Sequence, residues 1–276
     1  MGRLASLSHP YLLGLLAALT LPTGGALAQA KLATPAVIQG QETPRSCKAP
    51  SDLLRLEWPL PRLAEAFKRG EDIRIVALGS SSTQGAGASS QAASYPARLL
   101  VELRGRFPQH KFEVINLGIG GQLASDMLPR LRTTVVALQP DLVIWQTGVN
   151  DAIRGVKISD FQATVESGLD VLKKAQIDVV LLNHQYYPGA ARLPNFPGYL
   201  RMMKQISTDR KIPLLRRYEI MQHMVTSSQY SLDELLAPDK FHLNDTSYRC
   251  LGAAVADALA QGLLPMAVKA TAGRAP

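Results

Sequence analysis

The chain has 276 residues, of which 46% are hydrophobic and 19% are charged, and its 30 Lys and Arg against 22 Asp and Glu give a formal net charge of +8. This is the composition of a globular protein, which excludes a disordered chain, a collagen and a coiled coil, and two cysteines cannot supply a disulfide scaffold or a four-ligand zinc site. No basic run is longer than two residues, so the charge lacks the concentration on one face that nucleic-acid binding requires, and we expect no nucleic-acid partner.

The N-terminus predicts a secretory signal peptide over residues 1–30. A basic residue, Arg3, precedes an apolar stretch over residues 11–21 that is too short to span a bilayer as a stable helix. Small residues at 26 and 28, and again at 28 and 30, fit a cleavage site. We therefore expect a periplasmic or secreted protein with no stable membrane span after cleavage. An uncleaved membrane anchor is the alternative.

Residues 31–59 are rich in Pro, Gln, Thr and Ala and have no sustained periodicity, which predicts a linker or an extension that lies on the domain. Cys47 lies in this segment, and Cys250 lies in the last predicted helix. In an exported protein the two could form a disulfide that ties the extension to that helix. Two free thiols are the equally open alternative.

From residue 60 onward, β-branched strand patterns alternate with helical patterns. The predicted strands are residues 73–78, 112–116, 141–147, 178–182 and 212–215, and the predicted helices are residues 60–69, 95–107, 127–138, 159–175, 199–210 and 245–261. Ser94 and Ser159 are the expected N-caps of two of these helices. The alternation predicts one doubly wound α/β domain over residues 60–265, a three-layer α/β/α sandwich with a five-stranded parallel sheet, followed by a tail over residues 266–276.

Polar and glycine-rich segments follow the predicted strands, where ligands bind in such folds. Serines follow the first strand (residues 80–82), glycines follow the second (residues 118–121), and an Asn-Asp pair follows the third (residues 150–151). Asp239 and His242 precede the last helix. A serine nucleophile, a histidine that takes its proton, a carboxylate that orients the histidine and amide donors for an oxyanion are the parts of an acyl-transfer site.

In this order, the segments resemble those of the SGNH hydrolase superfamily, the hydrolases with a GDSL-type motif and a flavodoxin-like fold. Residues 79–82, Gly-Ser-Ser-Ser, stand at the family's Gly-Asp-Ser-Leu position, so the resemblance makes Ser81 the nucleophile. Asp239 and His242 match its Asp-x-x-His block and would complete the catalytic triad. Ser80 replaces the usual Asp, a position outside the triad, and the run of three serines leaves Ser82 as the rival nucleophile.

The resemblance also implies an oxyanion hole that consists of the backbone N–H groups of Ser81 and Gly121 and the side chain of Asn150. Val149 and His184, which follow the third and fourth predicted strands, are candidates for substrate contact. For His184, a loop position with no role in the reaction is an equal alternative.

These residues predict an exported, metal-independent serine esterase that needs no cofactor and acts as a monomer. The expected substrate is a small-molecule or glycan ester with a short acyl group, such as an acetyl group on carbohydrate, because no long apolar insertion is available to hold an acyl chain. The family also includes lysophospholipases and acyl-thioesterases, and an O-acyltransferase would use the same site. These activities, and a non-catalytic binding module, remain alternatives.

Two other α/β functions fit the sequence poorly. Residues 118–121 do not complete the G-x-G-x-x-G pattern of dinucleotide binding, and no phosphate-binding P-loop pattern occurs. An α/β-hydrolase would have a G-x-S-x-G motif and an acid on a loop well before the histidine, whereas Asp239 is three residues from His242.

Overall fold

The computed structural model describes the backbone of residues 46–272 and the side chains of residues 46–263. The predicted signal peptide and residues 31–45 lie outside the described residues. The strands are β1 (Ile73–Gly79), β2 (Phe112–Gly118), β3 (Leu142–Gln146), β4 (Asp178–Leu182) and β5 (Leu214–Leu215). The helices are α1 (Ser51–Leu54), α2 (Pro61–Arg69), α3 (Ser81–Gln84), α4 (Tyr95–Arg106), α5 (Ala124–Arg130), α6 (Val149–Ile153), α7 (Ile158–Lys174), α8 (Phe196–Arg210), α9 (Arg217–Thr226), α10 (Leu232–Leu235) and α11 (Asp245–Ala272), with 3₁₀ turns η1 (Gln91–Ala93) and η3 (Pro188–Arg192) and a π-helical segment η2 (Leu131–Val135).

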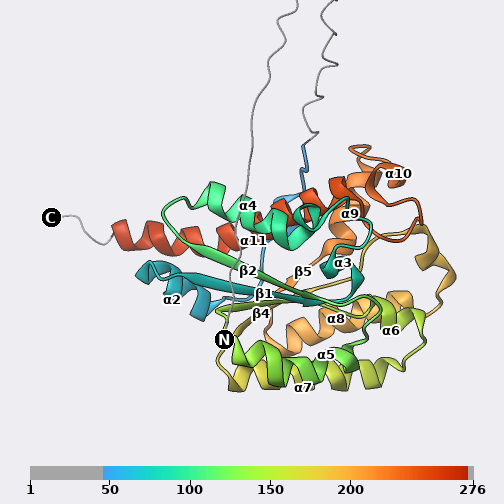
Figure 1. The fold of residues 1–276 in the computed structure, drawn as a ribbon, viewed down its shortest axis with the longest axis horizontal. Coiled ribbons are helices and arrows are strands. Elements are labelled where there is room, and N and C mark those ends of the chain that lie inside the picture. The colour runs from blue at the N-terminus through green and yellow to red at the C-terminus, as the bar shows by residue number, and fades with distance from the viewer. Residues whose placement is uncertain (1–45, 273–276) are drawn as a thin grey trace, which may run out of the picture. The chain divides into compact units, whose positions relative to one another are not determined.

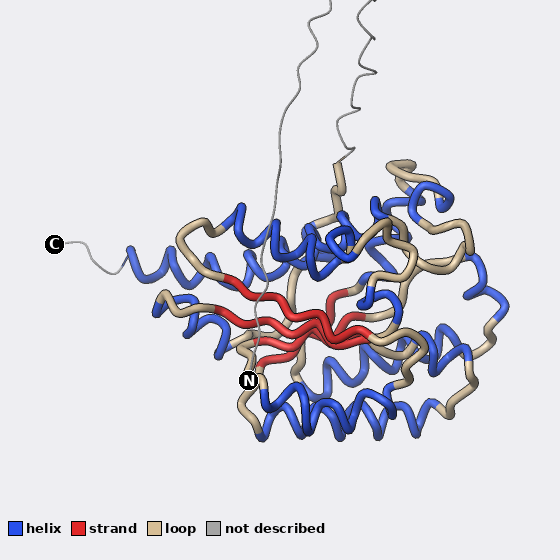
Figure 2. The backbone as a smooth tube through the Cα atoms, in the orientation of Figure 1, coloured by secondary structure: helices blue, strands red, loops and turns tan. Residues whose placement is uncertain are grey.

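The five strands form one parallel sheet in the order β2-β1-β3-β4-β5. Helices α4 and α11 pack together on one face of the sheet, and α5, α7 and α8 pack on the other (Figures 1 and 2). Every residue of β3 is buried, because its largely apolar run is covered by helices on both sides. The predicted doubly wound, three-layer fold is therefore confirmed.

The strand order places a topological switch point between β1 and β3. The chain leaves β1 to form β2 on one side of it, and then leaves β2 to form β3 on the other side. Such a reversal leaves a crevice at the carboxyl ends of the two central strands, where ligands bind in open α/β sheets. Helices α3 and α6 begin at this edge of the sheet (Figure 1).

Of the two predicted N-caps, Ser94 stands at the N-cap position of α4 as predicted, and Ser159 does not stand at that of α7. Ser94 does precede α4, but its hydroxyl donates to the carbonyl of Gln91, 2.7 Å away, and caps no helix N–H group. The prediction for Ser159 is wrong, because the N-cap of α7 is Lys157 and Ser159 lies inside the first turn. A serine near the start of a helical pattern locates the N-terminus of the helix only to within a residue or two.

The structure also contains helices that the sequence patterns did not indicate. Helix α9 buries Ile220, Met221 and Met224 on one side, and the short helix α10 precedes the loop that carries Asp239. Helix α11 continues to Ala272, so the residues expected as a tail begin inside a helix. Within residues 46–272, no helix is long and apolar enough to cross a membrane.

The extension before α2 belongs to the packed structure where it is described. Leu54 and Leu60 are buried in the core, and Cys47 forms a disulfide with Cys250 in α11. The bond closes a loop between positions 203 residues apart, a constraint on the unfolded chain that stabilises a fold by about 2–5 kcal/mol. Of the two open alternatives for the cysteines, the structure shows the disulfide.

Polar side chains are buried just beyond β4, under helices α8 and α9. His184 is fully buried against Phe196, with ring centroids 4.8 Å apart, and neither ring nitrogen has a hydrogen-bond partner. Arg217 is also buried, and its guanidinium donates to the carbonyl of Asn183 (2.9 Å) and to the amide oxygen of Gln185 (3.1 Å). Burial, together with the charge of Arg217, lowers the pKa of His184 to about 3. His184 is therefore neutral in the folded protein at neutral pH.

This shift predicts an acid-sensitive contribution to stability. The unfolded chain binds a proton at His184 below about pH 6.5 and the folded protein does not, so the unfolding free energy falls as the pH falls from 6.5 toward 3. Between pH 7 and pH 5 we expect wild type to lose about 2 kcal/mol more than a His184→Leu variant, measured by urea unfolding. Histidines that titrate alike in both proteins cancel in this difference. An identical pH dependence for the two proteins would contradict the prediction.

Candidate active site

The nucleophile turn, residues 79–85, begins where β1 ends. A Cβ at Gly79 would lie 2.1 Å from the hydroxyl oxygen of Thr83 and 2.8 Å from the amide oxygen of Gln146, so only glycine allows this close approach. Ser81 then starts the single turn of α3, and Gly85 ends it with a left-handed φ of 103°. Ser81 is thereby presented at the carboxyl edge of the sheet with its side chain partly exposed.

Ser81, His242 and Asp239 form a continuous hydrogen-bonded chain. The His242 Nε2 atom lies 2.9 Å from the Ser81 Oγ atom, and its Nδ1 atom lies 2.6 Å from the Asp239 Oδ2 atom. The other carboxylate oxygen of Asp239 accepts the backbone N–H groups of Phe241 (3.0 Å) and His242 (2.9 Å). With Nδ1–H bonded to the carboxylate, Nε2 is free to accept the serine proton.

The carboxylate of Asp239 is held in its charged form. Partial burial raises the pKa of this group, but the hydrogen bonds from the His242 ring and from the two backbone N–H groups lower it more, so the pKa of Asp239 lies below its usual range. A charged Asp239 stabilises the imidazolium that His242 becomes when it takes the serine proton.

The histidine loop, residues 237–244, is fixed against the chain that follows the nucleophile turn. Gly87 contacts it so closely that a Cβ there would lie 2.4 Å from the carbonyl oxygen of Leu243. From α11, Tyr248 donates to the carbonyl of Ala86 (2.6 Å), and Asp245 accepts the backbone N–H of Ser89 (2.7 Å). These contacts set the position of His242 relative to Ser81, although 161 residues separate them in the chain.

The oxyanion loop, residues 118–123, follows β2 and lies beside the nucleophile turn. Gly121 has a left-handed φ of 77°, which favours glycine. Among the hydrogen bonds of residues 46–263, none uses the backbone N–H of Ser81 or Gly121. The amide nitrogen of Asn150 donates one hydrogen to the carbonyl of Gln122 (2.8 Å), which leaves its second N–H for another acceptor. The three predicted oxyanion donors thus have hydrogens available, and the loop brings Gly121 beside Asn150.

Three side chains that were not predicted as site residues hold the oxyanion loop in place. Gln84, in the same helix as Ser81, accepts the backbone N–H of Gly120 (2.9 Å). Arg154, at the end of the helix that carries Asn150, donates to the carbonyl of Gly121 (3.0 Å). Asp151, a buried residue, accepts the N–H of Ala124, the first residue after the loop, with both carboxylate oxygens at 3.2 Å. Their roles depend on neighbours from other strands, which no local pattern in the sequence reveals.

Two predicted substrate contacts are wrong. Val149 is only 2% exposed and His184 is not exposed at all, so neither side chain can touch a substrate bound beside Ser81. Ser82, the rival nucleophile, is also buried at 2% exposure, whereas Ser81 is the serine that meets His242. The geometry therefore favours Ser81 over Ser82.

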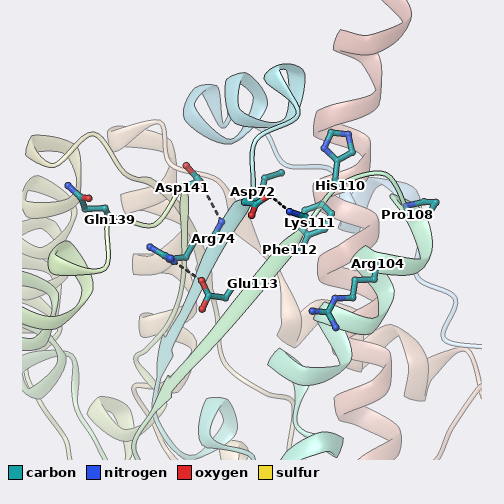
Figure 3. Close-up of a pocket in the computed structure, with 11 residues that line it drawn as sticks. Asp72, Arg74, Arg104, Pro108, His110, Lys111, Phe112, Glu113, Gln139 and Asp141 are labelled. Carbon is teal, nitrogen blue, oxygen red and sulfur yellow. Dashed lines mark hydrogen bonds and ion pairs between the residues drawn. The ribbon is translucent and has the colours of Figure 1, made fainter.

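A large cavity of about 730 Å³ lies at the opposite end of the sheet, where β1 and β2 begin (Figure 3). Most of its charged side chains are already paired, as in the 2.7 Å contact of Arg74 with Glu113 and the 3.6 Å contact of Lys111 with Asp72. Its lining contains no serine, threonine or cysteine that could serve as a nucleophile. The chemistry that the sequence predicts belongs to the carboxyl edge of the sheet.

Comparisons with known proteins agree with this fold. An acetylxylan esterase of Geobacillus stearothermophilus is 27% identical over 128 residues, which cover 42% of this chain and 58% of that protein. Thioesterase 1/protease 1/lysophospholipase L1 of Escherichia coli (strain K12) is 25% identical over 186 residues, 66% of this chain and 85% of that protein. The chain thus spans little more than half of the first relative and most of the second.

Among solved structures, a two-domain esterase active on acetylated mannans has the same fold. Its TM-score is 0.64 at 24% identity, over 76% of this chain and 56% of that one. The sequence profile of the Non-GDSL lipase-like family matches residues 46–264, which includes all the residues of the predicted site and begins before Cys47. The predicted resemblance to the SGNH hydrolase superfamily is thereby confirmed, and the chain belongs to the Non-GDSL lipase-like family.

Proposed function

We propose that the protein is a serine esterase that hydrolyses carboxylic esters through an acyl-serine intermediate. The observation that carries the proposal is the chain of contacts from Ser81 Oγ to His242 Nε2 (2.9 Å) and from His242 Nδ1 to Asp239 (2.6 Å). It provides a nucleophile, a general base and a group that orients the base.

The reaction follows from these positions. Ser81 Oγ attacks the ester carbonyl while His242 Nε2 takes its proton, and the oxyanion accepts hydrogen bonds from the N–H groups of Ser81 and Gly121 and from Asn150. The intermediate collapses, the bond to the alcohol breaks, and His242 returns the proton to the departing oxygen. Water, deprotonated by His242, then attacks the acyl-serine and releases the acid and free Ser81.

For the substrate, we propose short acyl esters, acetyl groups on carbohydrate above all. Two similar proteins, the acetylxylan esterase and the esterase active on acetylated mannans, support this choice. None of three large cavities, of about 730, 560 and 260 Å³, is lined by Ser81, Asn150 or His242, so none of them is a channel for a long acyl chain at the nucleophile. The Escherichia coli relative supports the alternative, a thioesterase or lysophospholipase.

Export is part of the same proposal. The disulfide between Cys47 and Cys250 supports it, because such bonds persist in oxidising compartments outside the cytosol. Mass spectrometry of the protein produced in a host with its native N-terminus should find a chain that begins near residue 29 or 31 and lies outside the cytosol, with the disulfide intact. An intact N-terminus on a cytosolic protein with two free thiols would contradict export.

Two single substitutions test the nucleophile. Ser81→Ala should lower kcat for p-nitrophenyl acetate by about 10³-fold or more and abolish labelling by a fluorophosphonate, because Ser81 carries the hydroxyl that is hydrogen-bonded to His242. Ser82→Ala, the matched control, should remain labelled, with kcat within about tenfold of wild type. The reverse pattern would assign the nucleophile to Ser82.

A series of p-nitrophenyl esters from acetyl to palmitoyl tests the substrate. We expect kcat/KM to be highest for acetyl or propionyl and to fall by about tenfold or more by octanoyl, because none of the three cavities that could enclose a longer chain is lined by Ser81. Acetate release from acetylated xylan and mannan, measured in parallel, tests the carbohydrate. A maximum at octanoyl or longer would favour the thioesterase or lysophospholipase alternative.

A further inference from the structure

Gln146, the last residue of β3, contacts the nucleophile turn with one oxygen. Its side chain is 1% exposed, and its amide oxygen accepts the backbone N–H of Ser80 (3.0 Å), the Ser80 hydroxyl (3.2 Å) and the Thr83 hydroxyl (3.1 Å). Ser80 and Thr83 are themselves buried, at 3% and 0% exposure. Water is therefore excluded as a substitute partner, and removing the oxygen would leave three donors unpaired.

The contact fixes the two atoms of Ser81 that the reaction uses. The Ser81 N–H belongs to the peptide that joins Ser80 to Ser81, and the N–H and hydroxyl of Ser80 are both held by Gln146. Thr83, two residues after Ser81, is held by the same oxygen. The segment that carries the Ser81 Oγ and N–H is thus secured on both sides of Ser81.

The same strand end also determines where Asn150 lies. Three residues separate Gln146 from Asn150, in the turn by which β3 passes into α6. Gln84 of α3 holds Gly120, Asn150 of α6 holds Gln122, and Arg154, directly after α6, holds Gly121. Polar contacts thus link α3 to the oxyanion loop and the oxyanion loop to α6. Gln146 closes the ring, because it joins α3 to β3, the strand that leads directly into α6.

We infer that Gln146 is a positioning residue that sets the oxyanion hole by fixing the nucleophile turn against the strand that leads to Asn150. The inference rests on the proposed esterase function. Gln146 does not reach the substrate, because it is buried below the turn. Its effect is on the direction of the Ser81 N–H and Oγ, and errors of about 1 Å in such groups can lower a rate by about 100-fold.

Gln146→Met tests the inference in the full-length protein, since methionine has a similar length and no oxygen. We expect kcat for p-nitrophenyl acetate to fall by about 10- to 100-fold with KM within about threefold of wild type, and fluorophosphonate labelling of Ser81 to slow by the same factor. Gln146→Glu keeps an oxygen that can accept from the three donors. Its log kcat should therefore lie at least a third of the way from the value of Gln146→Met back to that of wild type.

Two further variants separate positioning from stability. Adding Ser80→Ala and Thr83→Val to Gln146→Met removes the unpaired hydroxyls, and should raise the melting temperature relative to Gln146→Met without raising kcat. Ser207→Ala removes a buried hydroxyl that donates to Ile212 (2.7 Å) outside the predicted site, and should lower the melting temperature with kcat unchanged. Together, these variants show how much a loss of stability alone changes kcat.

The inference is overturned if Gln146→Met keeps kcat within threefold of wild type, or if the triple variant recovers activity and stability together. It is also overturned if Gln146→Glu is no more active than Gln146→Met. A wild-type protein that neither turns over the ester nor takes the fluorophosphonate label would instead refute the esterase proposal on which the inference rests, so the two failures are distinguishable.

Discussion

The parallel pairing of β1 with both β2 and β3 is the constraint on which the site depends. The register sets Gly79 opposite Gly118, and Leu78 opposite Trp145. The turns after these three strands therefore start at the same level of the sheet, about 5 Å apart from one strand to the next. Because of this spacing, backbone groups after β1 and β2 and a side chain after β3 can point toward a single substrate oxygen.

Register alone does not orient a loop, and here the orientation comes from polar contacts between neighbouring loops. Gln84, Gln146 and Arg154 each join two of the three segments that carry the oxyanion donors. Such contacts contribute only about 1 kcal/mol each when formed, but leaving a buried partner unpaired costs more. The low tolerance for unpaired groups makes the arrangement specific, since a shifted loop would lose several of these bonds together.

The sequence predicted the fold and the triad residues because both depend on order along the chain. Strand and helix patterns alternate, and Ser81, Asp239 and His242 stand at expected positions between them. The predictions of substrate contact were wrong because they depend on the direction in which a side chain points. Val149 and His184 follow strands as predicted, yet both point into the protein, and the polar partners of the nucleophile turn are brought to it by strand pairing alone. Position after a strand indicates which edge a residue occupies and leaves open which way it faces.

Asp239 and His242 share one loop, and the sheet does not control the position of either residue. The loop lies between α10 and α11, and it is fixed by Tyr248 and Asp245 of α11 against the residues after the nucleophile turn. Cys250, in the same helix, is bonded to Cys47, so the described part of the N-terminal extension is tied to the helix that holds the His242 loop. The disulfide therefore restrains the same helix whose Tyr248 and Asp245 hold the histidine loop beside the nucleophile turn.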